Sequence, residues 1–183
     1  MNFTGPGVSF AAQQRLHFLR HNGATEDPGK GVSHLVLKLA LEAADDLGGY
    51  EKLFDMRDGV VDDGLYLDGD ELSYYPYYSA AHTVRLQPQA FYWLTLTRSP
   101  AGELVGYVDG AEQFRVADAD GRSSAISSSG MVTFFHDDND TSGEHFAGVV
   151  TRIRLFDSVL TPAQVAALTG LDIQVVAVLA NQA

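Results

Sequence analysis

The amino-acid sequence predicts an all-β fold in which antiparallel strands form a sandwich. Most segments are short, apolar or aromatic, and separated by Gly, Asp, Ser and Pro, which is the spacing of strands and turns. Only residues 162–169 carry convincing helix signals. With 183 residues and 45% hydrophobic side chains, the chain can build one core, so we expect a single domain over residues 1–183.

Composition excludes several classes of partner. The chain has 24 acidic and 12 basic side chains, and the resulting net charge of -12 repels phosphates and anionic lipids, so nucleic acid is not an expected partner. A charged fraction of 20% argues against insertion into a membrane. Because cysteine is absent, the sequence has neither a disulfide framework nor a thiolate site. The first residues lack a basic region followed by a long apolar run, so no signal peptide is expected within this sequence.

The first long strand is predicted from alternating leucines. Leucines at alternate positions of residues 35–41 lie on one face if the segment is a strand. The Ala, Leu, Glu and Lys content also suits a helix, and this alternative stays open. Eight further strands are expected at residues 51–57, 64–68, 72–75, 91–97, 103–108, 113–116, 131–135 and 149–156.

Turn and cap residues separate the later elements. Asp68-Gly69 and Asp109-Gly110 predict hairpin turns, and Ser-Pro-Ala-Gly at residues 99–102 predicts another. Thr161 followed by Pro162 and Gln164 has the pattern of a capped helix start, and Gly170 predicts the end of that helix. The apolar residues 173–179 then predict a final strand.

Two segments in the second half of the chain resemble a known family. Residues 91–114, FYWLTLTRSPAGELVGYVDGAEQF, and residues 148–168, GVVTRIRLFDSVLTPAQVAAL, resemble laminin G-like and concanavalin A-like domains. With FFHDDND between them, the run is similar to the laminin G-like domains of exported bacterial proteins. The first 50 residues match this family only in strand character.

The resemblance implies a jelly roll of two antiparallel sheets, an extracellular or cell-surface location, frequent bound calcium and frequent adhesion to glycans or proteins. The chain shows no sorting tail, which is a departure from the exported proteins and leaves its location open.

The loop at residues 136–144 is the candidate metal site. It reads His-Asp-Asp-Asn-Asp-Thr-Ser-Gly-Glu, and a hard cation such as calcium prefers six to eight oxygen ligands of these types. An EF-hand is rejected, because its twelfth position would be Val149 and not a bidentate Glu. A solvated turn rich in Asp and Asn is the alternative. The candidate ligands are Asp137, Asp138, Asn139, Asp140 and Glu144.

A second acidic cluster has a weaker claim to a site. Carboxylates surround Gly59 and Gly64, and solvation of a hairpin is the expected reason for them. Its members are Asp55, Asp58, Asp62 and Asp63.

A tyrosine-rich segment at residues 73–79 is the candidate ligand-binding surface. Tyrosine rings stack on sugar faces, and their hydroxyls bond to sugar hydroxyls. In a strand, however, one of each adjacent pair faces the core, so ordinary packing accounts for at least half of them. Trp93, which lies in mid-strand, is also expected in the core. The candidate residues are Tyr74, Tyr75, Tyr77, Tyr78 and His82.

Catalytic patterns are missing from the sequence. It has no alternating Glu and Asp run of the glucanase type, no nucleophile elbow, no metalloprotease helix and no phosphate loop. We therefore expect a non-catalytic binding or adhesion domain, with a glycan or a surface protein as partner and calcium as its one expected cofactor. The alternative is a structural assembly subunit that self-associates through the apolar residues 172–180. A glycan-active hydrolase or lyase is a third hypothesis.

Overall fold

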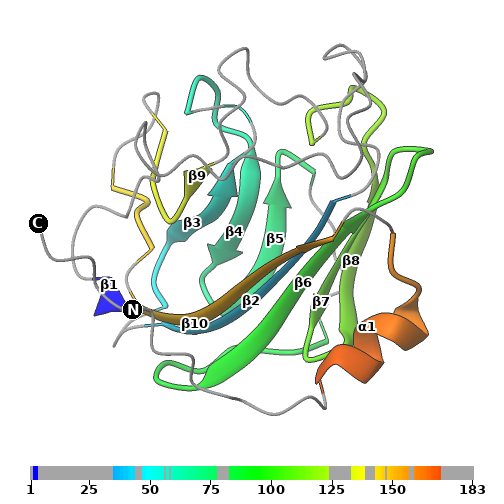
Figure 1. Ribbon diagram of the computed structural model, residues 1–183. Helices are drawn as coiled ribbons and strands as arrows, with labels where there is room; N and C mark the ends of the chain where they lie inside the picture. The colour runs from blue at the N-terminus through cyan, green and yellow to red at the C-terminus, as the bar shows by residue number, and fades with distance from the viewer. Residues whose placement is uncertain are drawn as a thin grey trace, which may run out of the picture.

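Two antiparallel sheets face each other in the computed structural model, and one short helix lies outside them (Figure 1). This arrangement confirms the predicted all-β sandwich with a single helix near residues 162–169. The structure describes residues 2–3, 35–43, 47–55, 57, 59–77, 83–123, 133–138, 143–146, 148–156 and 159–169.

The larger sheet brings together segments from both ends of the chain. Its order is β1 (Asn2–Phe3), β10 (Gly148–Phe156), β2 (Leu35–Ala43), β6 (Phe91–Arg98), β7 (Glu103–Val108) and β8 (Ala111–Ala117). The segment with alternating leucines is therefore a strand and not a helix. It pairs antiparallel with β10 on one side and with β6 on the other.

The smaller sheet has four strands. Its order is β5 (Glu71–Tyr75), β4 (Gly64–Asp68), β3 (Tyr50–Asp55) and β9 (Thr133–Phe134). β9 ends at Phe134, one residue before the end of the strand expected at residues 131–135, and residues 131–132 lie outside the described residues. It pairs with the end of β3. A bulge in β3 shifts its register with β4 between Lys52 and Phe54.

The predicted turns connect the hairpins, with one shift in position. Asp109 and Gly110 both have positive φ, 48° and 82°, and form the two-residue loop between β7 and β8. Between β4 and β5, Asp68 still pairs with Glu71, so the loop is Gly69 and Asp70, one residue later than the expected dipeptide. Gly69 supplies the positive φ that this tight loop requires.

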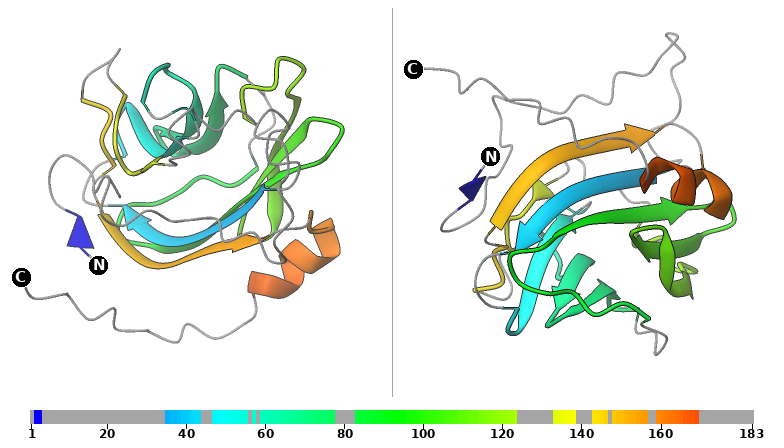
Figure 2. Two further views of the ribbon diagram at one scale, coloured as in Figure 1. Left: turned by 45° about the horizontal axis from the view of Figure 1, so that its top comes forward. Right: turned by 90° about the horizontal axis from the view of Figure 1, so that it is seen from below.

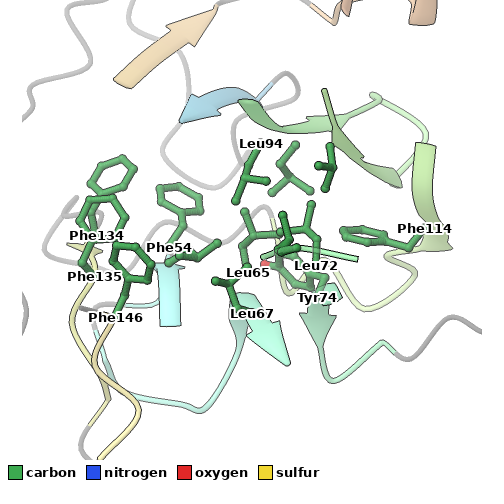
Figure 3. Packing of buried hydrophobic residues seen from close by; sticks show 14 of the residues in the cluster. Phe54, Leu65, Leu67, Leu72, Tyr74, Leu94, Phe114, Phe134, Phe135 and Phe146 are labelled. Carbon is green, nitrogen blue, oxygen red and sulfur yellow. The ribbon is translucent and has the colours of Figure 1, made fainter. Parts of the chain in front are cut away.

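The core fills the space between the two sheets (Figure 3). Most of its members are alternate residues of their strands, since side chains alternate between the faces of a strand. Leu53 and Phe54 are consecutive, at the bulge in β3. A second group of phenylalanines, Phe134, Phe135 and Phe146, closes one end of this core beside Phe54. The four-stranded sheet supplies Leu53, Phe54, Leu65, Leu67, Leu72 and Tyr74, and the six-stranded sheet supplies Leu94, Leu96, Leu104, Val108 and Phe114.

Helix α1 (Pro162–Thr169) packs on the outer face of the six-stranded sheet (Figure 2). Its predicted cap is confirmed: the backbone N–H of Thr161 donates to Oε1 of Gln164 at 2.8 Å, and the backbone N–H of Gln164 donates to Oγ1 of Thr161 at 3.3 Å. Val165 is fully buried against Val105 and Tyr107 of β7.

The remaining expectations concern Trp93 and the apolar segment near the C-terminus. Trp93 is buried, as expected. The strand expected at residues 173–179 and the helix end at Gly170 lie outside the described residues. In the described part of the chain, no helix has the length and apolar character needed to cross a membrane.

Close packing of Phe114 against the backbone of β7 predicts a sensitive position at Gly106. A Cβ at this residue would stand where the ring of Phe114 lies. We therefore expect Gly106→Ala to lower the free energy of unfolding by about 1–3 kcal/mol, the usual cost of overpacking. Chemical denaturation measures the loss.

The double variant Gly106→Ala with Phe114→Leu is the control, because the smaller side chain makes room for the added methyl group. It should be more stable than the sum of the two single losses predicts. Strict additivity would contradict the assigned clash.

Candidate functional site

Three tyrosines form a row on the outer face of the four-stranded sheet. Leu65 and Leu67 point into the core, so Tyr66 between them faces outward. The rings of Tyr50 and Tyr75, from the strands on either side, meet the ring of Tyr66 edge to face, with centroids 6.2 and 6.4 Å away. Tyr66 is 1% exposed and Tyr50 is 39% exposed, so the row has a buried centre and an open end.

A buried lysine lies beneath this row. The Nζ atom of Lys52 is 2.6 Å from Oδ2 of Asp138, 3.3 Å from Oδ2 of Asp55 and 3.9 Å from Oδ1 of Asp62. The same atom is 5.2 Å from the centroid of the Tyr66 ring, within the range of a cation–π contact. Lys52 is fully buried, so its charge is balanced by these carboxylates and not by water.

Two described stretches, residues 135–138 and 143–146, contact β3 beside Lys52. The backbone N–H of Lys52 donates to the carbonyl of Glu144 at 2.7 Å, and Lys52 forms a parallel bridge with His145. The carboxylate of Asp137 accepts the backbone N–H groups of Asp138 and Glu144, each at 2.9 Å. The backbone N–H of Asp137 donates to Nδ1 of His145 at 3.1 Å. Asp137 therefore holds the two ends of this loop together.

Backbone strain marks the entry to the loop. Phe135 has a φ of 60°, a conformation that bulky residues rarely adopt. It is fully buried, and its backbone N–H donates to the carbonyl of Leu53 at 3.2 Å. Packing against Phe134 and Phe146 stabilises this conformation, which turns the chain from β9 toward Asp137 and Asp138.

Burial raises the pKa of three carboxyl groups in this cluster, and repulsion between carboxylates adds to the effect for Glu144 and Asp62. Burial, together with repulsion from Asp62, Asp137 and Asp138, raises the pKa of Glu144 to about 7. Burial also raises the pKa of Asp55, against the opposing effect of Lys52. The pKa of Asp62 is raised by burial as well, although the hydroxyl of Tyr66 donates to it at 2.6 Å.

The candidate metal ligands are only partly described by the structure. It places Asp137, Asp138 and Glu144 in one cluster, and Asn139 and Asp140 lie outside the described residues. Among the residues that are described, no group of three or more His, Asp or Glu side chains is placed to hold a metal ion. Asp138 is hydrogen-bonded to Lys52. Calcium binding stays a prediction.

The tyrosine-rich segment is divided between two sides of β5. Tyr74 is in the core and 1% exposed, so a ligand at the surface does not reach its ring. Tyr75 faces outward to Tyr66. Tyr77 stacks on Tyr74, with centroids 6.1 Å apart, and its hydroxyl donates to Asp118 at 2.7 Å. Tyr78 and His82 lie outside the described residues.

Asp118 anchors Tyr77 within a separate polar network. The guanidinium of Arg98 donates to Asp118 at 3.0 Å, and Ser123 also bonds to this carboxylate. Burial opposes the ionisation of Asp118, but hydrogen bonds from Ser123, Tyr77 and Arg98 outweigh it and lower its pKa. With every one of these partners paired inside the protein, Tyr77 has a structural position.

Sequence reasoning missed Tyr50, Lys52 and Tyr66 as site residues. A signal was present for Tyr66, because the leucines on either side were expected on one face and the opposite face belongs to the tyrosine. For Lys52 no local signal exists, since its closest partner, Asp138, is 86 residues away in the sequence.

Comparison with known proteins identifies the fold alone. No family model matches the sequence, and no curated protein matches it. Among solved structures, the chain is similar to a candidate carbohydrate-binding protein from Bacteroides ovatus, at 18% identity over 75% of this chain and 41% of that one, with a TM-score of 0.56.

Two further structures share the fold. Domain 4 of an extracellular arabinanase from Geobacillus stearothermophilus, in complex with arabinotriose, is 16% identical over 75% of this chain and 66% of that one, with a TM-score of 0.56. A SAP-like pentraxin from Limulus polyphemus is 17% identical over 76% of this chain and 71% of that one, with a TM-score of 0.53. The chain thus spans less than two thirds of the Bacteroides and Geobacillus structures. It has the jelly-roll sandwich architecture that these domains share.

The raised pKa of Glu144 predicts how stability depends on pH. Its ordinary value is 4.5 and its value in the fold is about 7, so between these limits the folded state binds more protons than the unfolded state. The contribution of Glu144 to the free energy of unfolding is fully present below pH 4.5 and is lost as the pH rises through about 7. Glu144→Gln should therefore raise the melting temperature at about pH 8 and change it little at about pH 4.

Asp120→Asn, which neutralises an exposed carboxylate elsewhere, is the matched control. It should show no comparable difference between the two pH values. An equal effect of Glu144→Gln at both pH values would contradict the raised pKa that burial and repulsion give Glu144.

Proposed function

We propose that this chain is a non-catalytic glycan-binding domain of the laminin G-like kind, and that it contacts its ligand with the outer face of the four-stranded sheet around Tyr50 and Tyr75. The observation that carries this proposal is the row in which these two rings flank Tyr66. A glycan of an extracellular or cell-surface partner is the expected ligand.

The chemistry of the face suits a sugar ring. Aromatic rings pack on the apolar C–H faces of sugars, while hydroxyl and carboxylate oxygens accept hydrogen bonds from sugar hydroxyls. The carboxylates of Asp62 and Glu144 border the tyrosine row, and both are partly exposed. A ligand rich in hydroxyl groups would donate hydrogen bonds to these carboxylates, whereas a wholly apolar partner would remove them from water at a cost.

The fold supports the same proposal. The matched structures include one named as a candidate carbohydrate-binding protein and a domain solved with arabinotriose. Fold alone does not define a ligand, so the tyrosine row is the feature that distinguishes this chain as a candidate glycan-binding domain.

Substitution of the exposed ring tests the site. We expect Tyr50→Ala to weaken binding to immobilised polysaccharides or a glycan array at least about fivefold, because removal of a central contact residue typically costs more than 1 kcal/mol. Tyr75→Ala should weaken binding in the same assay.

Phe91→Ala provides a matched control, since Phe91 is an aromatic residue of similar exposure, 44%, on the six-stranded sheet. It should bind as the unaltered protein does. If Phe91→Ala loses binding and Tyr50→Ala keeps it, the ligand lies on the other sheet. If no glycan class binds, a protein ligand is favoured, and release of reducing ends would favour the hydrolase or lyase hypothesis.

Calcium is proposed as an additional ligand of the loop at residues 136–144. Because Lys52 holds Asp138, an ion would depend on Asp137, Glu144 and the oxygens of Asn139 and Asp140. Binding would relieve the repulsion that raises the pKa of Glu144. We expect about 1 mM calcium to raise the melting temperature and a chelator to reverse the change. No heat of binding and no thermal shift would end this proposal.

The alternative of an assembly subunit depends on residues 172–180, which lie outside the described residues. Size-exclusion chromatography with light scattering, on the full chain and on a chain cut after Gly170, distinguishes the two functions. A monomer in both cases would remove the assembly hypothesis.

A further inference from the structure

Three separate segments of the chain converge on one nitrogen atom. Asp55 ends β3, Asp62 lies between β3 and β4, and Asp138 follows β9. Their carboxylates lie 3.3, 3.9 and 2.6 Å from Nζ of Lys52, respectively. The side chains of Lys52, Asp55 and Asp138 are at most 1% exposed. This arrangement is what a bound cation produces, with oxygen ligands gathered from distant parts of the sequence.

Negative charge exceeds positive charge at this point even with the ammonium present. Three carboxylates around one ammonium already leave an excess of negative charge, and Glu144 and Asp137 add to it. A buried carboxylate without a partner is costly, and removal of one member of a buried pair usually destabilises a protein strongly. Lys52 is therefore the group that allows the two loops to approach β3.

The other partners of the carboxylates show that the site is built around the charge. Asp55 also accepts the backbone N–H groups of Arg57 and Gly59. Asp62 accepts the hydroxyl of Tyr66. The ring of Tyr66 covers the ammonium at 5.2 Å. The carboxylates of Asp55 and Asp62 are thus oriented by contacts besides the one with Lys52.

We propose that Lys52 is a tethered cation occupying a cation site made by Asp55, Asp62 and Asp138, and that removal of its side chain leaves a site for a small exchangeable cation, above all a primary alkylammonium ion. An ammonium on the chain does not dissociate, so these loops are fixed at any concentration of free ions. This role is independent of the glycan proposal.

Chemical rescue tests the proposal. Lys52→Ala leaves both the space and the negative charge, whereas Lys52→Met leaves the charge but fills the space with an unbranched side chain of similar length. Both variants should melt about 10 °C below the unaltered protein, because a buried pair has lost one partner. Ethylammonium chloride should raise the melting temperature of Lys52→Ala in a saturable way and leave that of Lys52→Met unchanged.

Tetramethylammonium chloride at the same concentration controls for ionic strength, since this ion donates no hydrogen bond. Calcium chloride is tested as a second probe. Only a rise in the melting temperature of Lys52→Ala that exceeds the rise for the unaltered protein counts as support. The proposal is overturned if ethylammonium acts on both variants equally, or if it acts no better than tetramethylammonium.

A double variant keeps the test decisive should Lys52→Ala not fold. Lys52→Met combined with Asp138→Asn removes the ammonium together with its nearest carboxylate, at 2.6 Å. If unpaired negative charge is what lowers the stability of Lys52→Met, the double variant should melt several degrees above Lys52→Met, although it carries one more substitution. A double variant no more stable than Lys52→Met would contradict the tethered-cation role.

Discussion

The contact between Lys52 and Asp138 is the interaction on which the candidate site depends. It joins β3, an inner strand of the four-stranded sheet, to a loop 86 residues later, at 2.6 Å and out of contact with water. Backbone hydrogen bonds also tie this loop to β3, from Lys52 to Glu144 and from Phe135 to Leu53, but they add no positive charge beside the carboxylate of Asp138. The lysine therefore decides whether an acidic loop can be buried here at all, since an unpaired carboxylate would have to be neutralised or hydrated.

The alternation of strand side chains lets one sheet serve the core and the site together. In β4, Leu65 and Leu67 pack between the sheets, while Tyr66 between them contacts Lys52 on the outer face. The same division separates Tyr74 from Tyr75 in β5. A shift of register by one residue would exchange the two faces, so the burial of the leucines also fixes the direction of the tyrosines. The position of the site is thus a consequence of core packing.

Local patterns predicted the elements but not their long-range pairing. Alternating leucines, Asp-Gly turns and the Thr161 cap each act within a few residues, and each gave a strand, a hairpin or a helix start where the structure has one. One loop lies a residue later than its dipeptide, because strand pairing between Asp68 and Glu71 set the register. Nothing local indicates that Lys52 would meet Asp138, since burial of a charged pair depends on which loops the finished fold brings together.

Two features that were predicted as separate sites are neighbours in the fold. The acidic loop reaches Lys52 through Asp138, Lys52 lies under the ring of Tyr66, and Tyr66 touches Tyr75 of the tyrosine-rich segment. The hydroxyl of Tyr66 also donates to Asp62, so the central ring of the tyrosine row is fixed from both its face and its hydroxyl. A ligand that contacts Tyr50 or Tyr75 therefore meets rings whose central support is set by the buried charge cluster. Substitutions in that cluster should make the tyrosine row less rigid and leave the groups that it presents to a ligand unchanged. The reason is that the charged groups lie beneath the rings and not at the exposed surface of the row.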